Sequence, residues 1–512
     1  MLNRRTFLRK SGQTLAAVIA GQLACTRKKR TGPNLLFVFA DQFRKQAMGF
    51  MNEDPVITPN FDRFAEQSLT FTNAVSTTPL CSPYRAMLMT GRFPMSTGVI
   101  CNCAAGIDFG LRKEEVCIGD VLKASGYQTG YIGKWHLENP SVNLSRNPID
   151  GATGWDAWTP PGPRRHGFDF WYAYNTSNDF WHPHYWKDSP QKIEIENQWS
   201  VEHETGIAMD FIRNRKPDQP FALFVSWNPP HPPYVAPQKY IDMYQDKELP
   251  VRPNATETEH RLPYYAAVTS CDDQFGRLMR FLDEQNLAEN TIVVFTSDHG
   301  ESMMSHGLMS KSWWYEEANG IPFMIRMPGK IKPRKTNMPF AVYNFMPTLL
   351  GIMDLAVPKT AEGDDLSGFV LGRDDKETDY AFIAHYPQPG DHRVIDRLAA
   401  SYVQLADDMK KEGIDWRKWG YRGLKSKRYT YVVDRRPDGI QEYHLRYQDR
   451  SLGTEYKGNG ELYTVRLLYD NINDPYQMNP VVAKEADEHP VMQQLDRELQ
   501  KWLNRSNDPF PL

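Results

Sequence analysis

Short, continuous apolar runs alternate with helical patterns along most of the chain. A long amphipathic helix is predicted over Tyr264 to Gln285. The apolar runs cover Asn34 to Phe39, Thr129 to Ile132, Phe221 to Val225, Ile292 to Thr296 and Pro322 to Ile325. Runs of this length without polar alternation are typical of strands that are buried on both faces of a sheet. The pattern therefore predicts an α/β fold, in which helices sandwich a large, mostly parallel sheet.

The pattern changes beyond about residue 375. Basic and aromatic residues mix with short alternating runs such as Arg428 to Val433, and Glu461 to Tyr469 is a further strand candidate. Val491 to Leu503 reads as a terminal helix. We therefore predict a large α/β domain over residues 31–375 that carries the active site, and a smaller C-terminal α+β domain with an antiparallel sheet over residues 376–512.

Residues 1–30 have the order of parts of an export signal. A basic segment with the pair Arg4-Arg5 precedes an apolar stretch from Thr14 to Ala24. That stretch is shorter than the ~20 residues that span a bilayer. It resembles a twin-arginine signal, so we expect export to the periplasm or cell surface. Cys25 lies in a loose match to a lipoprotein cleavage site, which leaves a lipid anchor open; the alternative reading of the whole segment is a basic N-terminal helix.

Composition excludes some classes of protein. Of 512 residues, 40% are hydrophobic, which is enough to bury a sizeable core, and the formal net charge of −3 gives no basis for a nucleic-acid binder. None of the six cysteines shows zinc-finger spacing, and a chain of this length needs no disulfide framework.

Polar residues follow the predicted strands at their carboxyl ends. In open α/β sheets, ligands bind in the crevice beyond those ends, so scattered segments converge on one site. The residues in question are Asp41, Gln42, Lys134, His136, His231, Asp298 and His299.

The strongest local feature is the run Cys81-Ser82-Pro83-Tyr84-Arg85. Ser82 is expected to cap a short helix that ends at Gly91. Cys81 would then sit at the amino end of the helix, where backbone N–H groups and the helix dipole favour an anion. The alternative is an ordinary buried cysteine before a helix.

The motif Cys-x-Pro-x-Arg, followed by four residues and Thr90-Gly91-Arg92, resembles the signature of the type I, formylglycine-dependent sulfatases of the alkaline phosphatase-like superfamily. The stretch from Gly126 to Leu137 resembles the second signature of that family, and the resemblance runs from Asn34 to Asn479. It implies that a formylglycine-generating maturation enzyme oxidises Cys81 to 3-oxoalanine, which is hydrated to a diol. Tyr84 replaces the Ser often found there, but Cys, Pro and Arg carry the recognition, so conversion is still expected.

The resemblance also implies one divalent cation. Gln42 stands where the family usually has a second Asp. Oxygen-rich ligation favours Ca²⁺, with Mg²⁺ as the alternative. The implied ligands are Asp41, Gln42, the oxidised residue 81, Asp298 and His299.

Catalytic roles follow from the same resemblance. A diol hydroxyl of residue 81 would attack sulfur, and His231, alone or together with Lys311, would protonate the leaving oxygen. His136 would then take the proton of the second hydroxyl, so that sulfate leaves and the aldehyde returns. The positive cradle for the developing charge would be Arg85, Lys134 and Lys311.

Two aromatic and basic regions, and one isolated histidine, are candidates for binding the rest of the substrate. Aromatic rings beside cationic groups suit a sulfated, anionic sugar, whereas a loop packed by its own aromatics is an equally good explanation. The candidates are Arg165, His166, Trp181, His182, His184 and His306. We therefore expect a sulfatase that acts on a sulfated polysaccharide or oligosaccharide.

Two other functions are also compatible with the sequence. A phosphonate monoester or phosphodiester hydrolase of the same superfamily would share the fold and the aldehyde. A non-catalytic sulfoglycan-binding protein would retain only the cradle. The sequence assigns no role to Asn344, which stands where the family commonly has Asp.

Overall fold

The computed structural model describes residues 32–104, 110–140, 155–386, 416–418, 420–437 and 462–512. The predicted export signal, with Cys25, lies outside the described residues. Within these ranges, no helix combines the length and the apolar character needed to cross a membrane.

The large sheet has the strand order β10-β2-β9-β8-β1-β7-β3-β4, with β11 beside β2. All of its pairings are parallel except those of β9, which runs antiparallel to both β2 and β8. The predicted fold class is therefore confirmed. The strands are β1 (Asn34–Asp41), β2 (Leu69–Val75), β3 (Gln128–Lys134), β4 (Phe170–Tyr174), β7 (Phe221–Pro230), β8 (Thr291–Ser297), β9 (Gly320–Arg326), β10 (Arg334–Thr336) and β11 (Phe340–Ala341).

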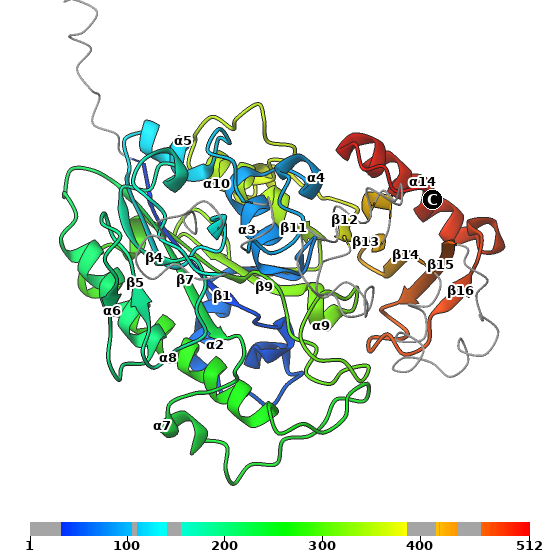
Figure 1. Cartoon of the computed structure of the whole chain (residues 1–512), viewed down its shortest axis with the longest axis horizontal. Coiled ribbons are helices and arrows are strands. Elements are labelled where there is room, and N and C mark those ends of the chain that lie inside the picture. Colours follow the sequence, from blue (N-terminus) through cyan, green and yellow to red (C-terminus); the bar gives the residue numbers. More distant parts are fainter. Residues whose placement is uncertain (1–31, 105–109, 141–154, 387–415, 419, 438–461) are drawn as a thin grey trace, which may run out of the picture.

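Helices cover both faces of this sheet, as Figure 1 shows. Alternate residues of β1 enter different cores: Phe37 belongs to the cluster with α3 (Cys81–Thr90), α5 (Ile118–Ala124) and α10 (Phe345–Ile352). Val38 belongs to the cluster with α2 (Pro59–Glu66), α6 (Ser200–Arg213) and α8 (Arg261–Glu284). A strand covered on both sides needs apolar residues at every position, which explains the unbroken run in the sequence.

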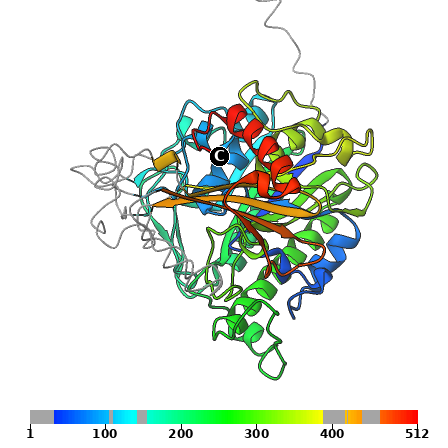
Figure 2. The ribbon, with the colours of Figure 1, turned by 90° about the vertical axis from the view of Figure 1, so that its right-hand side faces the viewer.

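The predicted antiparallel sheet near the C-terminus is also present. Its order is β12-β13-β14-β15-β16, and all its pairings are antiparallel. Helix α14 (Pro490–Ser506) packs across it (Figure 2). The domain boundary near residue 375 stays a prediction. The strands are β12 (Ala381–His385), β13 (Gly420–Lys425), β14 (Tyr429–Pro437), β15 (Leu462–Asp470) and β16 (Val481–Ala483).

Short elements connect the larger ones. The short strands are β5 (His184–Tyr185) and β6 (Ile193–Glu194). The short α-helices are α4 (Pro94–Thr97), α7 (Gln238–Ile241), α9 (Glu316–Asn319) and α11 (Ser367–Val370). The 3₁₀ helices are Lys45–Ala47, Gly49–Met51, Pro163–Arg165, Ala288–Asn290, Val342–Asn344, Trp416–Lys418 and Ala486–Glu488.

A buried carboxylate links the two sheets. Glu316 in α9 accepts from Lys45 at 2.5 Å, and it also forms an ion pair with Lys425 of β13. The Lys425 side chain is fully buried and donates to Asn319 Oδ1 at 2.9 Å as well. Helix α9 follows closely after Lys311. This contact therefore fixes the small sheet to the segment that carries Lys311.

We predict that Glu316→Ala destabilises the protein by about 3 kcal/mol or more, because removing one partner leaves buried ammonium groups without their anion. Urea and thermal unfolding midpoints measure the change. The matched control is Glu498→Ala, which breaks the exposed pair with Lys501 and should cost less than about 1 kcal/mol. Equal midpoints for the two variants would contradict the prediction.

Candidate active site

Four neighbouring strands deliver the polar residues to one edge of the large sheet. Strands β8, β1, β7 and β3 are consecutive in the sheet and mutually parallel. Asp41 ends β1, Asp298 follows β8, Lys134 ends β3, and His231 follows β7 directly. The structure therefore brings these side chains together beyond the carboxyl ends, where ligands bind in such sheets.

Helix α3 begins two residues earlier than the sequence pattern predicts. Cys81 is its first residue, Leu80 is the N-cap, and Gly91 ends it in the left-handed conformation with φ 63°. Ser82 is not the cap, because Asn102 Oδ1 accepts from the Ser82 N–H at 3.1 Å. The Ser82 hydroxyl instead donates to the carbonyl of His136 at 2.6 Å, which joins the helix to the second signature.

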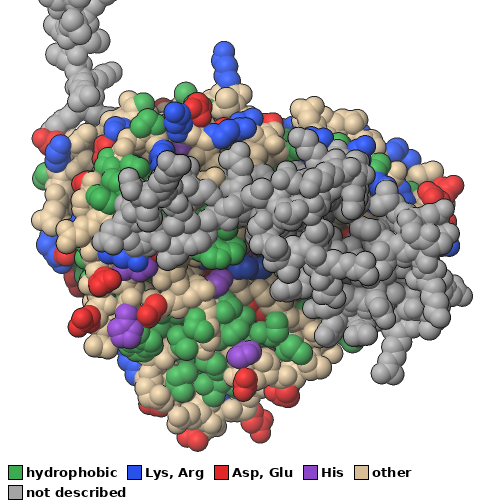
Figure 3. Space-filling view, viewed as in Figure 1, with side chains coloured by type: hydrophobic (Ala, Val, Ile, Leu, Met, Phe, Trp, Pro, Cys, Tyr) green, Lys and Arg blue, Asp and Glu red, His purple; other side chains and the backbone are tan. Residues whose placement is uncertain are grey.

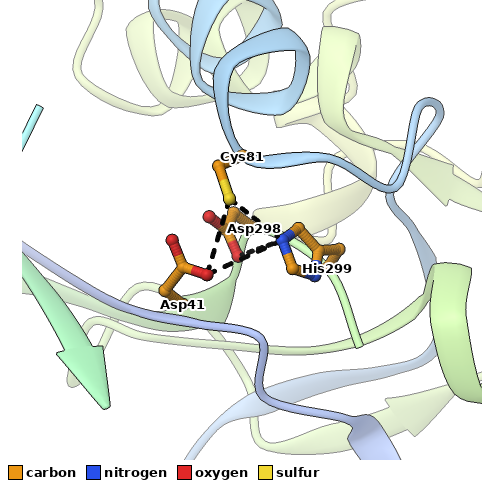
Figure 4. Close-up of side chains that lie close together, drawn as sticks. All are labelled: Asp41, Cys81, Asp298 and His299. Carbon is orange, nitrogen blue, oxygen red and sulfur yellow. Dashed lines mark hydrogen bonds and ion pairs between the residues drawn. The ribbon is translucent and has the colours of Figure 1, made fainter. Parts of the chain in front are cut away.

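The Cys81 side chain points toward Asp41, Asp298 and His299 (Figure 4). Its Sγ is 3.6 Å from Asp41 Oδ1 and 3.4 Å from His299 Nε2. The ammonium groups of Lys311 and Lys134 lie 3.3 Å and 3.9 Å from the same sulfur. Residue 81 is buried, so these charges act on it with little screening by water.

Arg85 holds the two carboxylates in place. One guanidinium nitrogen lies 3.1 Å from both Asp41 Oδ2 and Asp298 Oδ2. The other donates to Ser226 Oγ at 2.7 Å and to the carbonyl of Lys134 at 2.6 Å. With these partners on both sides and no exposed surface, the Arg85 side chain is fixed in one position.

The arrangement around Asp41 and Asp298 fits a divalent cation. Asp41, Cys81, Asp298 and His299 each place one potential ligand atom within 4.8 Å of the others. His299 Nδ1 lies 3.0 Å from the carbonyl of Gly300, so Nε2 faces the carboxylates. Burial, followed by the neighbouring Asp41, raises the pKa of Asp298 to about 7. A cation bound between the two carboxylates would offset this repulsion.

Gln42 completes the candidate ligand set. It follows β1 with a left-handed φ of 61°, and its backbone N–H donates to Asp298 Oδ1 at 3.0 Å. Its side-chain oxygen accepts from Lys311 at 2.7 Å. The amide oxygen therefore points toward the cluster, where it is available as a neutral ligand.

Cationic side chains around residue 81 stabilise negative charge on it. Burial raises the pKa of the Cys81 thiol, and so does Asp41, but Lys134, Lys311 and His299 outweigh them and hold that pKa well below its usual range. The same lysines, with His231, hold the pKa of Asp41 well below its usual value against the effect of burial.

Two histidines face this region. His136 is buried with φ 52°, and neither ring nitrogen has a hydrogen-bond partner among the described residues. His231 follows the strand end, with Nδ1 2.9 Å from the carbonyl of Pro232. Burial, together with Lys311 and Lys134, lowers the pKa of His231 to about 3.

Sequence reasoning missed a residue that orients Lys134. Asn228 is buried, its Oδ1 accepts from Lys134 Nζ at 3.0 Å, and its Nδ2 donates to the carbonyl of Ser177 at 2.5 Å. Lys134 Nζ also lies 2.7 Å from Asp41 Oδ2. Asn228 lies directly before the Pro-Pro-His run, near the end of β7. A polar residue near a strand end is the sequence feature that could have identified it.

The substrate-binding candidates fall into two groups, and the first group is held by contacts with neighbouring residues. Arg165 is buried, pairs with Asp188 at 2.7 Å and donates to two backbone carbonyls. His166 is buried as well, 3.3 Å from the carbonyl of Glu115, and His306 stacks on Tyr315 at 3.7 Å between ring centroids. These three side chains are engaged with other parts of the fold, and no hydrogen bond or ion pair within the described residues joins them to the Cys81 cluster.

The remaining candidates lie near or at the surface. Trp181 is 37% exposed, and His182 is exposed beside it. His184 pairs with Asp156 at 2.6 Å. The sequence reasoning also missed Trp155, which is 46% exposed and has its ring 6.3 Å from that of His136. Histidine and hydrophobic side chains lie side by side on the face shown in Figure 3.

Asn344 has a structural position. It is buried, and its Oδ1 accepts from the Asp364 N–H at 2.8 Å. This contact fixes the segment that follows α10.

A mostly parallel sheet with carboxylates and cationic groups at its carboxyl edge is the arrangement of the alkaline phosphatase-like hydrolases. The Sulfatase family model matches residues 33–355. An endo-4-O-sulfatase of Bacteroides thetaiotaomicron is 35% identical, with 93% of each chain covered. A ulvan-active sulfatase of Formosa agariphila is 32% identical over 94% of this chain and 83% of its own.

A solved structure from work on glycosaminoglycan metabolism by Bacteroides thetaiotaomicron is similar with a TM-score of 0.78 at 33% identity. It covers 93% of this chain and 97% of that one. The chain belongs to the sulfatase family and is a sulfuric ester hydrolase.

We predict that Asn228→Ala lowers kcat/KM for a sulfate ester about 10-fold or more, because Lys134 loses the partner that directs its ammonium group. Steady-state kinetics measure this, with the thermal midpoint as a check of folding. The matched control is Gln500→Ala, which removes an exposed amide that contacts Asn504 in α14. Unchanged kcat/KM in a folded Asn228→Ala protein would show that Asn228 does not position Lys134 for the reaction.

Proposed function

We propose that the protein hydrolyses sulfate monoesters on a polysaccharide or oligosaccharide, with its nucleophile made from Cys81. The observation that carries this proposal is the position of Cys81, buried between two lysines and next to two carboxylates at the strand ends. A thiol at this position has no second hydroxyl with which to expel sulfate. Conversion of Cys81 to the aldehyde by a maturation enzyme would supply that hydroxyl after hydration.

We propose Asp41, Gln42, Asp298 and His299 as the protein ligands of one divalent cation. When bound, the cation would withdraw electron density from the nucleophilic oxygen and from the sulfate. Ca²⁺ is favoured, because carboxylate and amide oxygens make up most of the ligand set; Mg²⁺ is the alternative.

The cationic side chains bind the group that is transferred. Lys134 and Lys311 approach residue 81 from different elements, so they can hold sulfate oxygens on either side of it. Arg85 acts indirectly, because it fixes both carboxylates and the backbone of Lys134. Such preorganised charges stabilise the negative charge that spreads over the transition state.

The two histidines and Lys311 move protons. His136 is buried and lies close enough to residue 81 for the two side chains to interact, which suits it to accept a proton from the second hydroxyl of that residue. His231 is close enough to Lys311, Lys134 and Asp41 for their charges to shift its pKa. Either His231 or Lys311 would protonate the leaving oxygen, since the negative charge of a bound sulfate ester favours the protonated form of the imidazole.

A carbohydrate substrate is supported by the aromatic and polar side chains at the surface. Trp155 lies next to His136, and Trp181 and His182 are exposed on the loop that follows β4. Exposed indole rings suit stacking against sugar rings. The names of the two curated relatives, an endo-4-O-sulfatase and a ulvan-active sulfatase, point in the same direction.

We also propose that the chain is exported to the periplasm or the cell surface. The support is the Arg4-Arg5 pair and the apolar stretch that follows it. Extracellular sulfated polysaccharide would then be accessible to the enzyme.

We predict that Cys81→Ala abolishes turnover and leaves the fold intact, since a methyl group in place of the side chain removes the nucleophile and only a small volume. Sulfate release and the thermal midpoint are the measurements. Cys117→Ser is the matched control, because Cys117 lies at the N-cap of α5 and serine is a favourable cap. Near-wild-type kcat for Cys81→Ala would rule out residue 81 as the nucleophile.

We predict that sulfated mono- and disaccharides are hydrolysed with higher kcat/KM than simple aryl sulfates, phosphodiesters or phosphonate monoesters. The reason is that only the sugars can use the aromatic surface in addition to the cradle. A parallel kinetic comparison of the four substrate classes tests this. Activity confined to aryl sulfates would argue against a carbohydrate substrate, and faster phosphodiester or phosphonate turnover would favour the competing hydrolase.

A further inference from the structure

A buried carboxylate behind the cluster contacts one of the candidate cation ligands. Glu301 is fully buried, three residues after Asp298. Its Oε2 accepts from the Gln42 amide nitrogen and from the Tyr234 hydroxyl at 2.7 Å. Glu301 itself has no contact with Cys81 among the described hydrogen bonds and ion pairs, so it acts on the site through Gln42.

The partners of Gln42 determine the orientation of its side-chain amide. On one side stands the Glu301 carboxylate, both of whose oxygens accept hydrogen bonds. On the other side stands Lys311, whose ammonium group can only donate, at 2.7 Å from Gln42 Oε1. An amide turned by 180° would lose both contacts. The NH₂ group therefore faces Glu301, and the carbonyl oxygen faces the cluster.

The second oxygen of Glu301 anchors the loop that carries Lys311. Oε1 accepts from the backbone N–H groups of Met303 at 2.8 Å and Ser310 at 2.7 Å. Several non-glycine residues of this loop have left-handed φ angles, a conformation that costs about 1–2 kcal/mol each. They are Met303 (45°), Met304 (62°), His306 (57°), Ser310 (68°) and Ser312 (79°). Such a loop keeps its shape only where contacts of this kind hold it.

We infer that Glu301 is a positioning residue, which turns the Gln42 amide so that its oxygen, and not its NH₂ group, is presented to the cation. An aspartate at position 42 would offer two equivalent oxygens and would need no such orientation. Glu301 therefore makes it possible for a neutral glutamine to serve as the ligand at this position. The inference rests on the proposed cation site.

The test is calorimetric titration of Ca²⁺ into metal-free protein, for wild type, Glu301→Gln, Gln42→Asp and the double variant. A glutamine at 301 can accept hydrogen bonds on one side only, so it loses either Gln42 and Tyr234 or the loop N–H groups. We expect Glu301→Gln to weaken Ca²⁺ binding about 10- to 100-fold when residue 42 is glutamine. In the Gln42→Asp background the same change should cost no more than about 2-fold.

Two further variants serve as a control and as a replacement. Glu115→Gln changes another buried carboxylate, which pairs with Arg92 and Arg112 away from the cluster, and it should leave Ca²⁺ affinity unchanged. Thermal midpoints in EDTA show whether each variant is folded. If Glu301→Gln does not fold, Glu301→Asp replaces it, since a side chain one methylene shorter cannot reach Gln42 and the loop together, and the same pattern is expected.

The outcomes distinguish the inference from the function on which it rests. A wild-type protein that binds no Ca²⁺ and no Mg²⁺ would overturn the cation site and the inference together. Tight binding by wild type with equal affinity in the folded Glu301 variants would overturn the inference alone. So would a loss of the same size in both backgrounds, because Glu301 would then act on binding by a route other than the Gln42 amide.

Discussion

The structure depends on the burial of two carboxylates side by side at the end of a parallel sheet. Asp41 and Asp298 extend from neighbouring strands, and a single guanidinium nitrogen of Arg85 lies between them. Buried like charges at this separation are costly unless cations compensate for them. Lys134 and Lys311, which hold the pKa of Asp41 below its usual value, and the proposed metal ion supply that compensation. The same positive charges are what an anionic sulfate ester needs, so compensating the buried carboxylates and binding the substrate are one electrostatic requirement.

The topology explains how distant segments meet this requirement. Parallel strands all end at one edge, so residues near positions 41, 134, 230 and 298 arrive there together without a dedicated connection. Helix α3 then places Cys81 at its first turn above the same edge. Hydrogen bonds from Ser82 and Arg85 to the backbone of the β3 segment fix the helix there. Position, more than intrinsic reactivity, makes this cysteine the candidate nucleophile.

The sequence predicted the sheet and the residues at its carboxyl edge, because unbroken apolar strands and polar strand ends are local patterns. It could not predict which residues pack between them. Arg165, His166 and His306 have chemistry that suits a substrate, yet only the folded chain shows that they are engaged by partners such as Asp188 and Tyr315. Asn228 and Glu301 were missed for the converse reason: their function depends on the lysine and the amide that they contact in three dimensions. The cap of α3 was misplaced because Asn102, from a later segment, satisfies the N–H of Ser82.

The central claim is that residue 81 acts as an oxidised residue and not as a thiol. The most direct measurement is mass spectrometry of the peptide that contains residue 81, made alongside sulfatase assays on protein produced with and without the maturation enzyme. We expect specific activity to rise in proportion to the fraction of aldehyde at residue 81, and protein with only the thiol to be folded but inactive. Full activity in protein whose residue 81 is entirely thiol would contradict it.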